Sequence, residues 1–204
     1  MKYTPGYRTT KVNPALIDRV LSASFAVMEK KGADIRDVTR LELRRAGHIN
    51  KNTFRSTVRD IGGVHTAVAQ DTRRYLESAL PHSFIPDQTM DIGFFLKLLD
   101  VLMLKRDRLE YAILSADRDF WPVMLSALEP MLRSVWLGSS EQTYSFSLKL
   151  LSTILAETMT AWHDKQYAVN YRLSCAKVLY KYVGAIWEMN FEMQDYLDVV
   201  SVFR

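Results

Sequence analysis

Cysteine is almost absent from the sequence, which contains Cys175 alone among 204 residues. A single thiol cannot form an intramolecular disulfide, and it excludes a cluster of thiolate metal ligands. Long apolar runs are missing as well, because Lys97 and Asp100 interrupt the most apolar stretch, residues 92–104. We therefore expect neither a signal peptide nor a membrane-spanning helix, and we predict a cytoplasmic protein.

Motifs typical of enzymes and metal sites are also lacking. The four histidines, His48, His65, His82 and His163, are far apart in the sequence and show no metal-binding spacing. There is no phosphate-binding glycine loop and no Gly-x-Ser-x-Gly nucleophile elbow. Glu157 and His163 can share a helical face, but without a nucleophile they do not make an active site. We expect no catalytic residue, no metal and no cofactor.

No stretch alternates apolar and polar residues as a strand would, whereas apolar residues recur at spacings of three and four along most of the chain. This pattern predicts an all-α fold. The expected helices run from Asn13 to Gly32, from Ile35 to the break at Ala46-Gly47, from Asn50 through Val58, and then over 64–80, 88–105, 107–116, 121–137 with a kink at Pro130, 139–164, 169–188 and 193–203.

The charge is distributed unevenly. Residues 1–59 contain 13 Lys or Arg against 5 Asp or Glu, whereas residues 60–204 contain 14 against 18. The net charges are therefore +8 and −4, so a polyanion is attracted to the N-terminal part. We predict a flexible basic arm at 1–12, a DNA-binding domain at 13–62 and a helical regulatory and dimerisation domain at 63–204, in which 63–80 form a connecting helix.

The segment from Ile35 to Arg59 has the pattern of a helix-turn-helix. Ile35, Val38 and Leu41 recur at helical spacing, Gly47 breaks the run, and two apolar anchors four residues apart follow. The polar residues that surround the anchors Phe54 and Val58 are the predicted DNA-binding residues: Asn50, Lys51, Asn52, Thr53, Arg55, Ser56 and Arg59. The alternative is a pair of packed helices with a solvated basic face.

The C-terminal helices carry two stripes with spacings of three and four residues, which indicate helix packing. One stripe lies in 139–164 and the other in 169–188, and the latter helix is apolar over more than one face. The predicted dimer-interface residues are Leu151, Leu155, Trp162, Leu173, Tyr180, Val183 and Trp187. The stripes are equally compatible with packing within one chain.

The middle helices are rich in Phe, Trp and Met, which fill cores more often than they line ligand sites. Collectively they permit a pocket for an apolar or aromatic ligand, with the kink at Pro130 opening space between helices. The candidate pocket residues are Phe94, Phe95, Leu98, Met103, Trp121, Met124 and Met159.

The order and spacing of these helices resemble the TetR family of bacterial transcription regulators. The local match lies within Ala15–Tyr75, where Ala46-Gly47 followed by Ile49-Asn50-Lys51-Asn52-Thr53-Phe54 is similar to the family's turn into its recognition helix. This variant of the turn is also similar to that of regulators related to the dihydroxyacetone-kinase operon activator. The resemblance implies a homodimer on a roughly palindromic operator, and a ligand-responsive repressor that binds double-stranded DNA and an apolar or aromatic small-molecule effector.

The sequence departs from the family pattern at several positions. His48 is an extra residue that is expected to widen the turn, and Arg55, Thr57 and Val58 stand where the family has Tyr or His and an aromatic residue. These departures support an alternative function. In this alternative, the chain forms a TetR-like helical dimer that no longer reads DNA and binds a protein partner or a hydrophobic small molecule.

Overall fold

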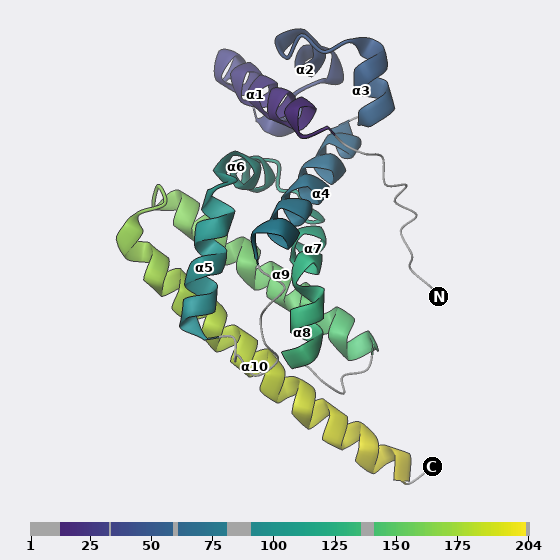
Figure 1. The fold of residues 1–204 in the computed structure, drawn as a ribbon, viewed down its shortest axis with the longest axis vertical. Coiled ribbons are helices and arrows are strands. Elements are labelled where there is room, and N and C mark those ends of the chain that lie inside the picture. Colours follow the sequence, from purple (N-terminus) through teal and green to yellow (C-terminus); the bar gives the residue numbers. More distant parts are fainter. Residues whose placement is uncertain (1–12, 33, 59–60, 81–90, 136–140, 203–204) are drawn as a thin grey trace. The chain divides into compact units, whose positions relative to one another are not determined.

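The computed structural model describes residues 13–32, 34–58, 61–80, 91–135 and 141–202. Every element in these ranges is a helix, which confirms the expected all-α fold (Figure 1). The chain divides into two compact units, Met1–Asp71 and Thr72–Arg204, and the division falls within helix α4 (Ile61–Ala79). No helix in the described ranges has the length and apolarity that crossing a membrane requires. The expected arm at 1–12 lies outside these ranges.

Helix α1 covers Pro14–Lys31, as predicted from its end signals. The Asn13 side chain accepts a hydrogen bond from the backbone N–H of Ala15 (3.0 Å), and the proline occupies the first turn, where no donor is needed. Gly32 ends the helix in the left-handed conformation at φ 59°, which glycine adopts without a steric penalty. The buried face consists of Leu16, Ile17, Val20, Leu21, Ala23, Ser24 and Val27.

The segment expected as one helix from Ile35 is divided in two. A short 3-10 helix, η1, covers Ile35–Asp37, and α2 covers only Arg40–Ala46. Between them Val38 has an extended backbone with φ −76° and ψ 119°. This interruption shifts the helical phase, so Leu41 is 48% exposed and does not share the buried face that its spacing predicted.

Polar side chains close the start of α2. The backbone N–H of Thr39 donates to the Glu42 carboxylate (2.9 Å), and the N–H of Glu42 donates to Thr39 Oγ1 (3.4 Å). Lys31, at the end of α1, forms an ion pair with the same carboxylate. The contact with Lys31, followed by the bonds from Thr39, lowers the pKa of Glu42 from 4.5 to about 2. Asp34 caps η1, because its side chain accepts a hydrogen bond from the backbone N–H of Arg36.

The remaining helices of the N-terminal unit are α3, Lys51–Thr57, and the first part of α4. The predicted anchors of α3 are confirmed, since Phe54 and Val58 are 0% and 2% exposed. Ile49, Leu43 and Val64 are buried in the same unit. An apolar core therefore holds one side of a helix that is only seven residues long.

In the C-terminal unit, the predicted kink at Pro130 is a break. The segment forms α7 (Phe120–Leu125), the 3-10 helix η2 (Ser126–Leu128) and α8 (Glu129–Val135), with Pro130 in the first turn of α8. Proline has no N–H to donate and is tolerated at that position, so it favours a new helix start. The two preceding helices are α5, Ile92–Met103, and α6, Arg106–Leu114.

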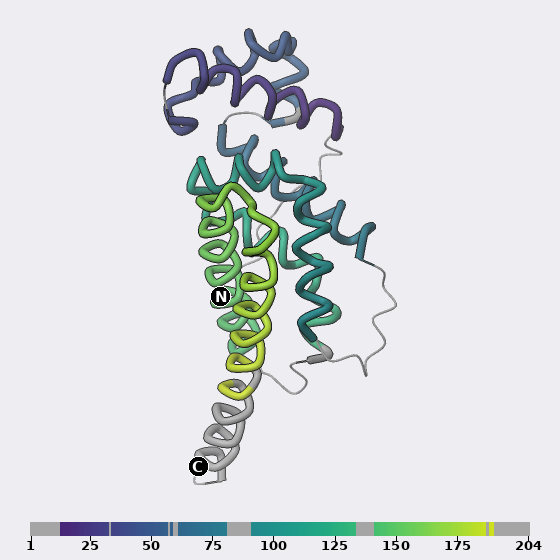
Figure 2. The backbone as a smooth tube through the Cα atoms, turned by 90° about the vertical axis from the view of Figure 1, so that its left-hand side faces the viewer, coloured from purple at the N-terminus to yellow at the C-terminus, as the bar shows by residue number. Residues whose placement is uncertain are grey.

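The last two helices are α9, Glu141–Asp164, and α10, Val169–Val202. The prediction of two separate helices at 169–188 and 193–203 is wrong, because α10 runs through both ranges without a break. Figure 2 shows α9 and α10 side by side, and α10 also packs against α5. The indole N–H of Trp162 donates to the carbonyl of Ala168 (3.0 Å) and closes the turn between α9 and α10.

Substitution of Glu42 by Gln tests the role of its carboxylate in the cap at the start of α2. The folded-state pKa of Glu42 lies below its ordinary value, so on acidification the unfolded chain takes up the proton first. The stabilisation by the carboxylate is complete above pH 4.5 and is lost as the pH falls to about 2. We expect Glu42→Gln to keep the hydrogen bonds with Thr39 but to lose less stability than the wild type over this range.

Urea unfolding followed by far-ultraviolet circular dichroism measures this difference. All four tryptophans, at 121, 136, 162 and 187, lie in the C-terminal unit, so their fluorescence provides an internal control. Equal acid sensitivity of the two proteins would contradict the assigned role of Glu42.

Candidate nucleic-acid interface

The turn between α2 and α3 is built from backbone hydrogen bonds. The N–H groups of Gly47, His48 and Ile49 donate to the carbonyls of Leu43 (2.9 Å), Arg45 (3.3 Å) and Arg44 (2.8 Å). This is the Schellman pattern of a helix C-terminus, in which one residue adopts the left-handed conformation. Here that residue is His48, with φ 48°. The extra residue noted in the sequence, His48, is therefore the residue at which the backbone reverses its handedness in the turn.

Arg19 of α1 contacts the same turn. Its Nη2 donates to the carbonyl oxygens of Gly47 and His48, both at 2.7 Å. Carbonyls at a helix C-terminus have no donor within the helix and need one from elsewhere. Arg19 therefore ties the turn to α1, although it was not among the predicted site residues and its sequence context gives no signal for this role.

Helix α3 presents the predicted DNA-binding residues to solvent. All six that the structure describes, Asn50, Lys51, Asn52, Thr53, Arg55 and Ser56, are exposed, and Arg59 lies outside the described ranges. At about 100° per residue, Asn52 and Ser56 lie opposite the buried anchors, with Thr53 and Arg55 on either side. Lys51 is closer to the buried face and is exposed because it begins the helix.

Two of these six side chains have structural roles. Asn50 caps α3 by accepting from the N–H of Asn52 (2.8 Å), and the Ser56 hydroxyl donates to the carbonyl of Thr53 (3.1 Å). The side chains of Lys51, Asn52 and Arg55 have no hydrogen bond or ion pair with any residue in the described ranges. Their polar groups are therefore available to a partner.

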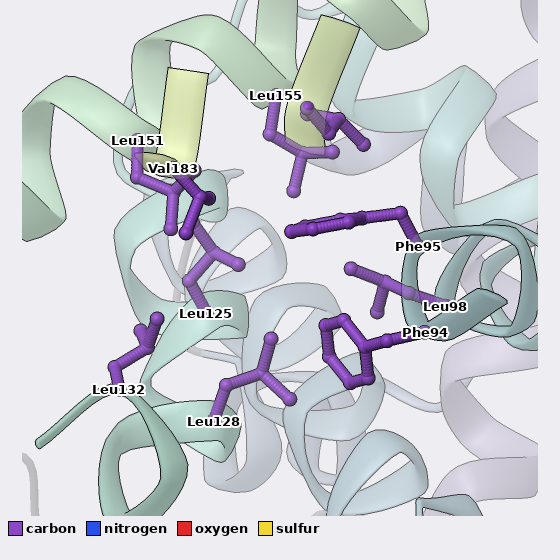
Figure 3. A pocket seen from close by; sticks show the side chains of 10 residues that line it. Phe94, Phe95, Leu98, Leu125, Leu128, Leu132, Leu151, Leu155 and Val183 are labelled. Atoms are coloured by element: carbon purple, nitrogen blue, oxygen red, sulfur yellow. The ribbon is translucent and has the colours of Figure 1, made fainter. Parts of the chain in front are cut away.

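Three of the predicted pocket residues, Phe94, Phe95 and Leu98, lie together. Figure 3 shows them facing side chains from α7, η2, α8, α9 and α10 around a cavity of about 10 Å³. That space accommodates about one water molecule, and hydrocarbon groups surround it. The cavity residues that sequence reasoning missed are Leu125, Leu128, Leu132, Leu151, Leu155, Leu179 and Val183.

The other four predicted pocket residues do not line this cavity. Trp121, Met124 and Met159 are buried at 5%, 0% and 0% exposure, and Met103 is half-buried. Met124 and Met159 come from α7 and α9, which contact each other, and they fill the core of the unit. The interior is thus packed where the sequence left open a ligand pocket.

Four predicted dimer-interface residues are buried within the chain. Leu151, Leu155, Trp162 and Val183 are each at most 4% exposed, and three of them face α5 residues across the small cavity. Their assignment to a subunit surface is wrong, because helices of the same chain already cover them.

The buried stripe of α10 also differs in phase from the predicted stripe. Its buried residues are Cys175, Ala176, Leu179, Val183 and Ile186, whereas Leu173 and Tyr180 are each 46% exposed. The side chain of Trp187 lies outside the described part of the chain. The prediction of a helix-packing seam is confirmed for α9, and its partner is α10 of the same chain.

An open groove of about 470 Å³ lies between α9 and α10. Val178 and Tyr182 in it are 40% and 48% exposed. Its remaining lining residues are Leu150, Thr153, Ile154, Glu157, Thr158, Ala161, Tyr171, Ser174 and Cys175. Burial raises the pKa of the Cys175 thiol, so this group is protonated at neutral pH. The spacing of Leu150, Ile154 and Ala161 could have revealed this second apolar stripe.

In comparisons with known proteins, no family model, no curated protein and no solved structure matches this chain. Within the described ranges, no group of three or more His, Cys, Asp or Glu side chains is arranged to hold a metal ion.

Replacement of His48 tests the strain in the turn. A left-handed backbone costs an L-residue about 1–2 kcal/mol, and glycine does not pay this cost but loses more entropy on folding. We expect His48→Gly to stabilise the N-terminal unit by about 0.5–1 kcal/mol in urea unfolding followed by circular dichroism. His48→Ala retains the backbone penalty and is the matched control. A glycine variant no more stable than the alanine variant would contradict the assignment.

Proposed function

We propose that this chain is a DNA-binding transcriptional regulator of the TetR-like type, which acts as a homodimer on a roughly palindromic operator. The observation that carries the proposal is the exposed face of α3, where Asn52 and Arg55 lack protein partners in the described ranges. This helix follows a tightly bonded turn in a part of the chain with net charge +8 over residues 1–59.

The side chains on α3 suit the two kinds of contact that DNA offers. An Asn amide can bond an adenine edge with its donor and its acceptor, whereas Arg and Lys neutralise phosphates. Asn52 lies on the outermost ridge of the helix and Arg55 on its flank, so we assign base reading to the former and phosphate contact to the latter. Lys51, at the first turn, is a second phosphate ligand in this proposal.

The dimer in this proposal uses the groove between α9 and α10. Two copies related by a two-fold axis would cover each other's groove, and the same residues would contribute on both sides. The groove is apolar at Leu150, Ile154 and Val178, and nothing within the described chain fills it. The residues that line the proposed interface therefore differ from those that the sequence stripes indicated.

An apolar effector can bind among the predicted pocket residues only if helices separate. Phe94, Phe95 and Leu98 surround about 10 Å³, whereas ligand pockets are roughly 300–1,000 Å³. Such a ligand would therefore select a conformation with a larger interior, and it would shift the population only by its preference for that state.

Substitutions on α3 distinguish base reading from phosphate contact. The probe is a duplex that the wild-type protein enriches from a random-sequence pool, with unselected duplex for comparison. We expect Asn52→Ala to weaken binding of the enriched duplex by about 1–3 kcal/mol and to leave unselected duplex unaffected. Arg55→Ala should weaken binding to both and reduce the slope of log affinity against log salt by about 0.9.

Lys30→Ala is the matched control, because it removes one positive charge from the last turn of α1, outside α3. Unchanged affinity in both α3 variants would overturn the proposed interface. Failure of the wild type to enrich any sequence would overturn the proposed function and favour a protein or small-molecule partner.

Placement of a carboxylate in the groove tests the dimer. Val178 is 40% exposed in the single chain, so we expect Val178→Glu to fold normally but to yield monomers, because the charge would be desolvated in the interface. Analytical ultracentrifugation measures the mass, and circular dichroism verifies the fold. Lys177→Glu introduces the same group on the adjacent exposed position and should remain dimeric. A dimeric Val178→Glu variant, or a monomeric wild type, would rule out this interface.

A further inference from the structure

The orientation of α3 depends on very few contacts. The helix has seven residues, and the buried apolar side chains in it and beside it are those of Phe54, of Ile49 before it and of Val58 after it. Apolar contacts are non-directional, so they bury one side of a short helix without fixing its tilt or its rotation. Directional bonds at one end of the helix have to supply this constraint.

Such bonds are present three and four residues before α3 begins. Arg19 Nη2 lies 2.7 Å from the carbonyl oxygens of both Gly47 and His48. These are the last two carbonyls before Ile49, which is buried, and Asn50, which caps α3. One guanidinium on an 18-residue helix thus fixes the peptide planes from which the short helix starts.

The turn cannot supply this constraint by itself. His48 has to hold a left-handed backbone at φ 48°, which costs an L-residue about 1–2 kcal/mol. A side chain on Gly47 would place Cβ 2.9 Å from Ile49 Cδ1 and 3.1 Å from the Leu43 carbonyl oxygen, so the turn is also tightly packed. Removal of Arg19 would leave a strained turn with two carbonyls that have lost their protein donor.

We propose that Arg19 is a positioning residue for DNA reading, which sets the orientation of α3 through the carbonyls of Gly47 and His48. This inference rests on the proposed function. Arg19 itself is exposed, and an exposed arginine can instead contact a phosphate. The two roles differ in their salt dependence, because a phosphate contact contributes about 0.9 to the slope of log affinity against log salt and a positioning contact contributes nothing.

The test uses the full-length chain with Arg19→Ala, Arg19→Lys and the control Lys30→Ala. Amide hydrogen exchange at residues 47–52 reports on the turn without DNA. We expect exchange there to accelerate about tenfold or more in Arg19→Ala, as for a hydrogen-bonded turn that has lost about 1–2 kcal/mol of local stability, and to be unchanged in Lys30→Ala. Arg19→Lys keeps the charge but replaces the rigid planar fork by a flexible ammonium, and we expect only partial recovery of protection.

Binding to the enriched and unselected duplexes then connects the turn to function. We expect Arg19→Ala to lose about tenfold or more of its preference for the enriched duplex, with an unchanged salt slope. Unselected duplex should bind about as well as it binds the Lys30→Ala control. Partial recovery of the preference in Arg19→Lys, parallel to its amide protection, would support positioning.

Three results would overturn the inference. A salt slope reduced by about 0.9 in Arg19→Ala and retained in Arg19→Lys would make Arg19 a phosphate ligand. Normal preference despite accelerated exchange would show that the reading of DNA does not depend on the turn. Unchanged exchange in Arg19→Ala would show that the turn does not need Arg19, whether or not DNA is bound. The last result leaves the proposed function intact, whereas absence of any enriched sequence for the wild type removes both.

Discussion

The packing of α9 against α10 is the constraint on which the C-terminal unit depends. Leu151 and Leu155 of α9 and Leu179 and Val183 of α10 are buried, and all four border the small cavity beside α5. Since each buried Leu or Val side chain contributes roughly 1.5–3 kcal/mol, this apolar layer dominates the local stability. This layer buries one face of each helix. Only the remaining surface of α9 and α10 is available to a partner.

The burial of one face of α9 and of α10 determines both the interior and the surface of the unit. The inward faces close around about 10 Å³, which leaves no room for a ligand without movement of α5 or α10. The outward faces form the open groove, in which Ile154, Val178 and Tyr182 remain without an apolar cover in the described chain. When a helix carries two apolar stripes, one stripe can fill the interior while the other remains exposed on the surface.

Local signals in the sequence were sufficient wherever structure depends on neighbouring residues. Asn13 and Gly32 marked the ends of α1 correctly, because capping and a left-handed backbone act within one turn. Pro130 was predicted as a kink within one helix, and it lies instead in the first turn of a new helix. The phase of α2 was wrong because the extended backbone at Val38 is not encoded in apolar spacing. Four of the predicted interface residues are buried within the chain, because spacing defines a stripe but does not identify what covers it. The predicted site on α3 is exposed as expected, while Arg19 has no local signal, since its partners lie 28 and 29 residues away.

The turn before α3 shows why that distant contact matters. With a glycine at the left-handed position, the backbone bonds of the turn would stabilise it by themselves. The pair of α2 and α3 would then need no contact from α1. His48 raises the free energy of the turn, because an L-residue has to hold the left-handed backbone. The two hydrogen bonds from Arg19, on α1, offset this free energy. The geometry of α3 is therefore a tertiary property of the N-terminal unit. Changes that move α1 relative to α2 would alter the exposed face of α3 without touching any residue on it.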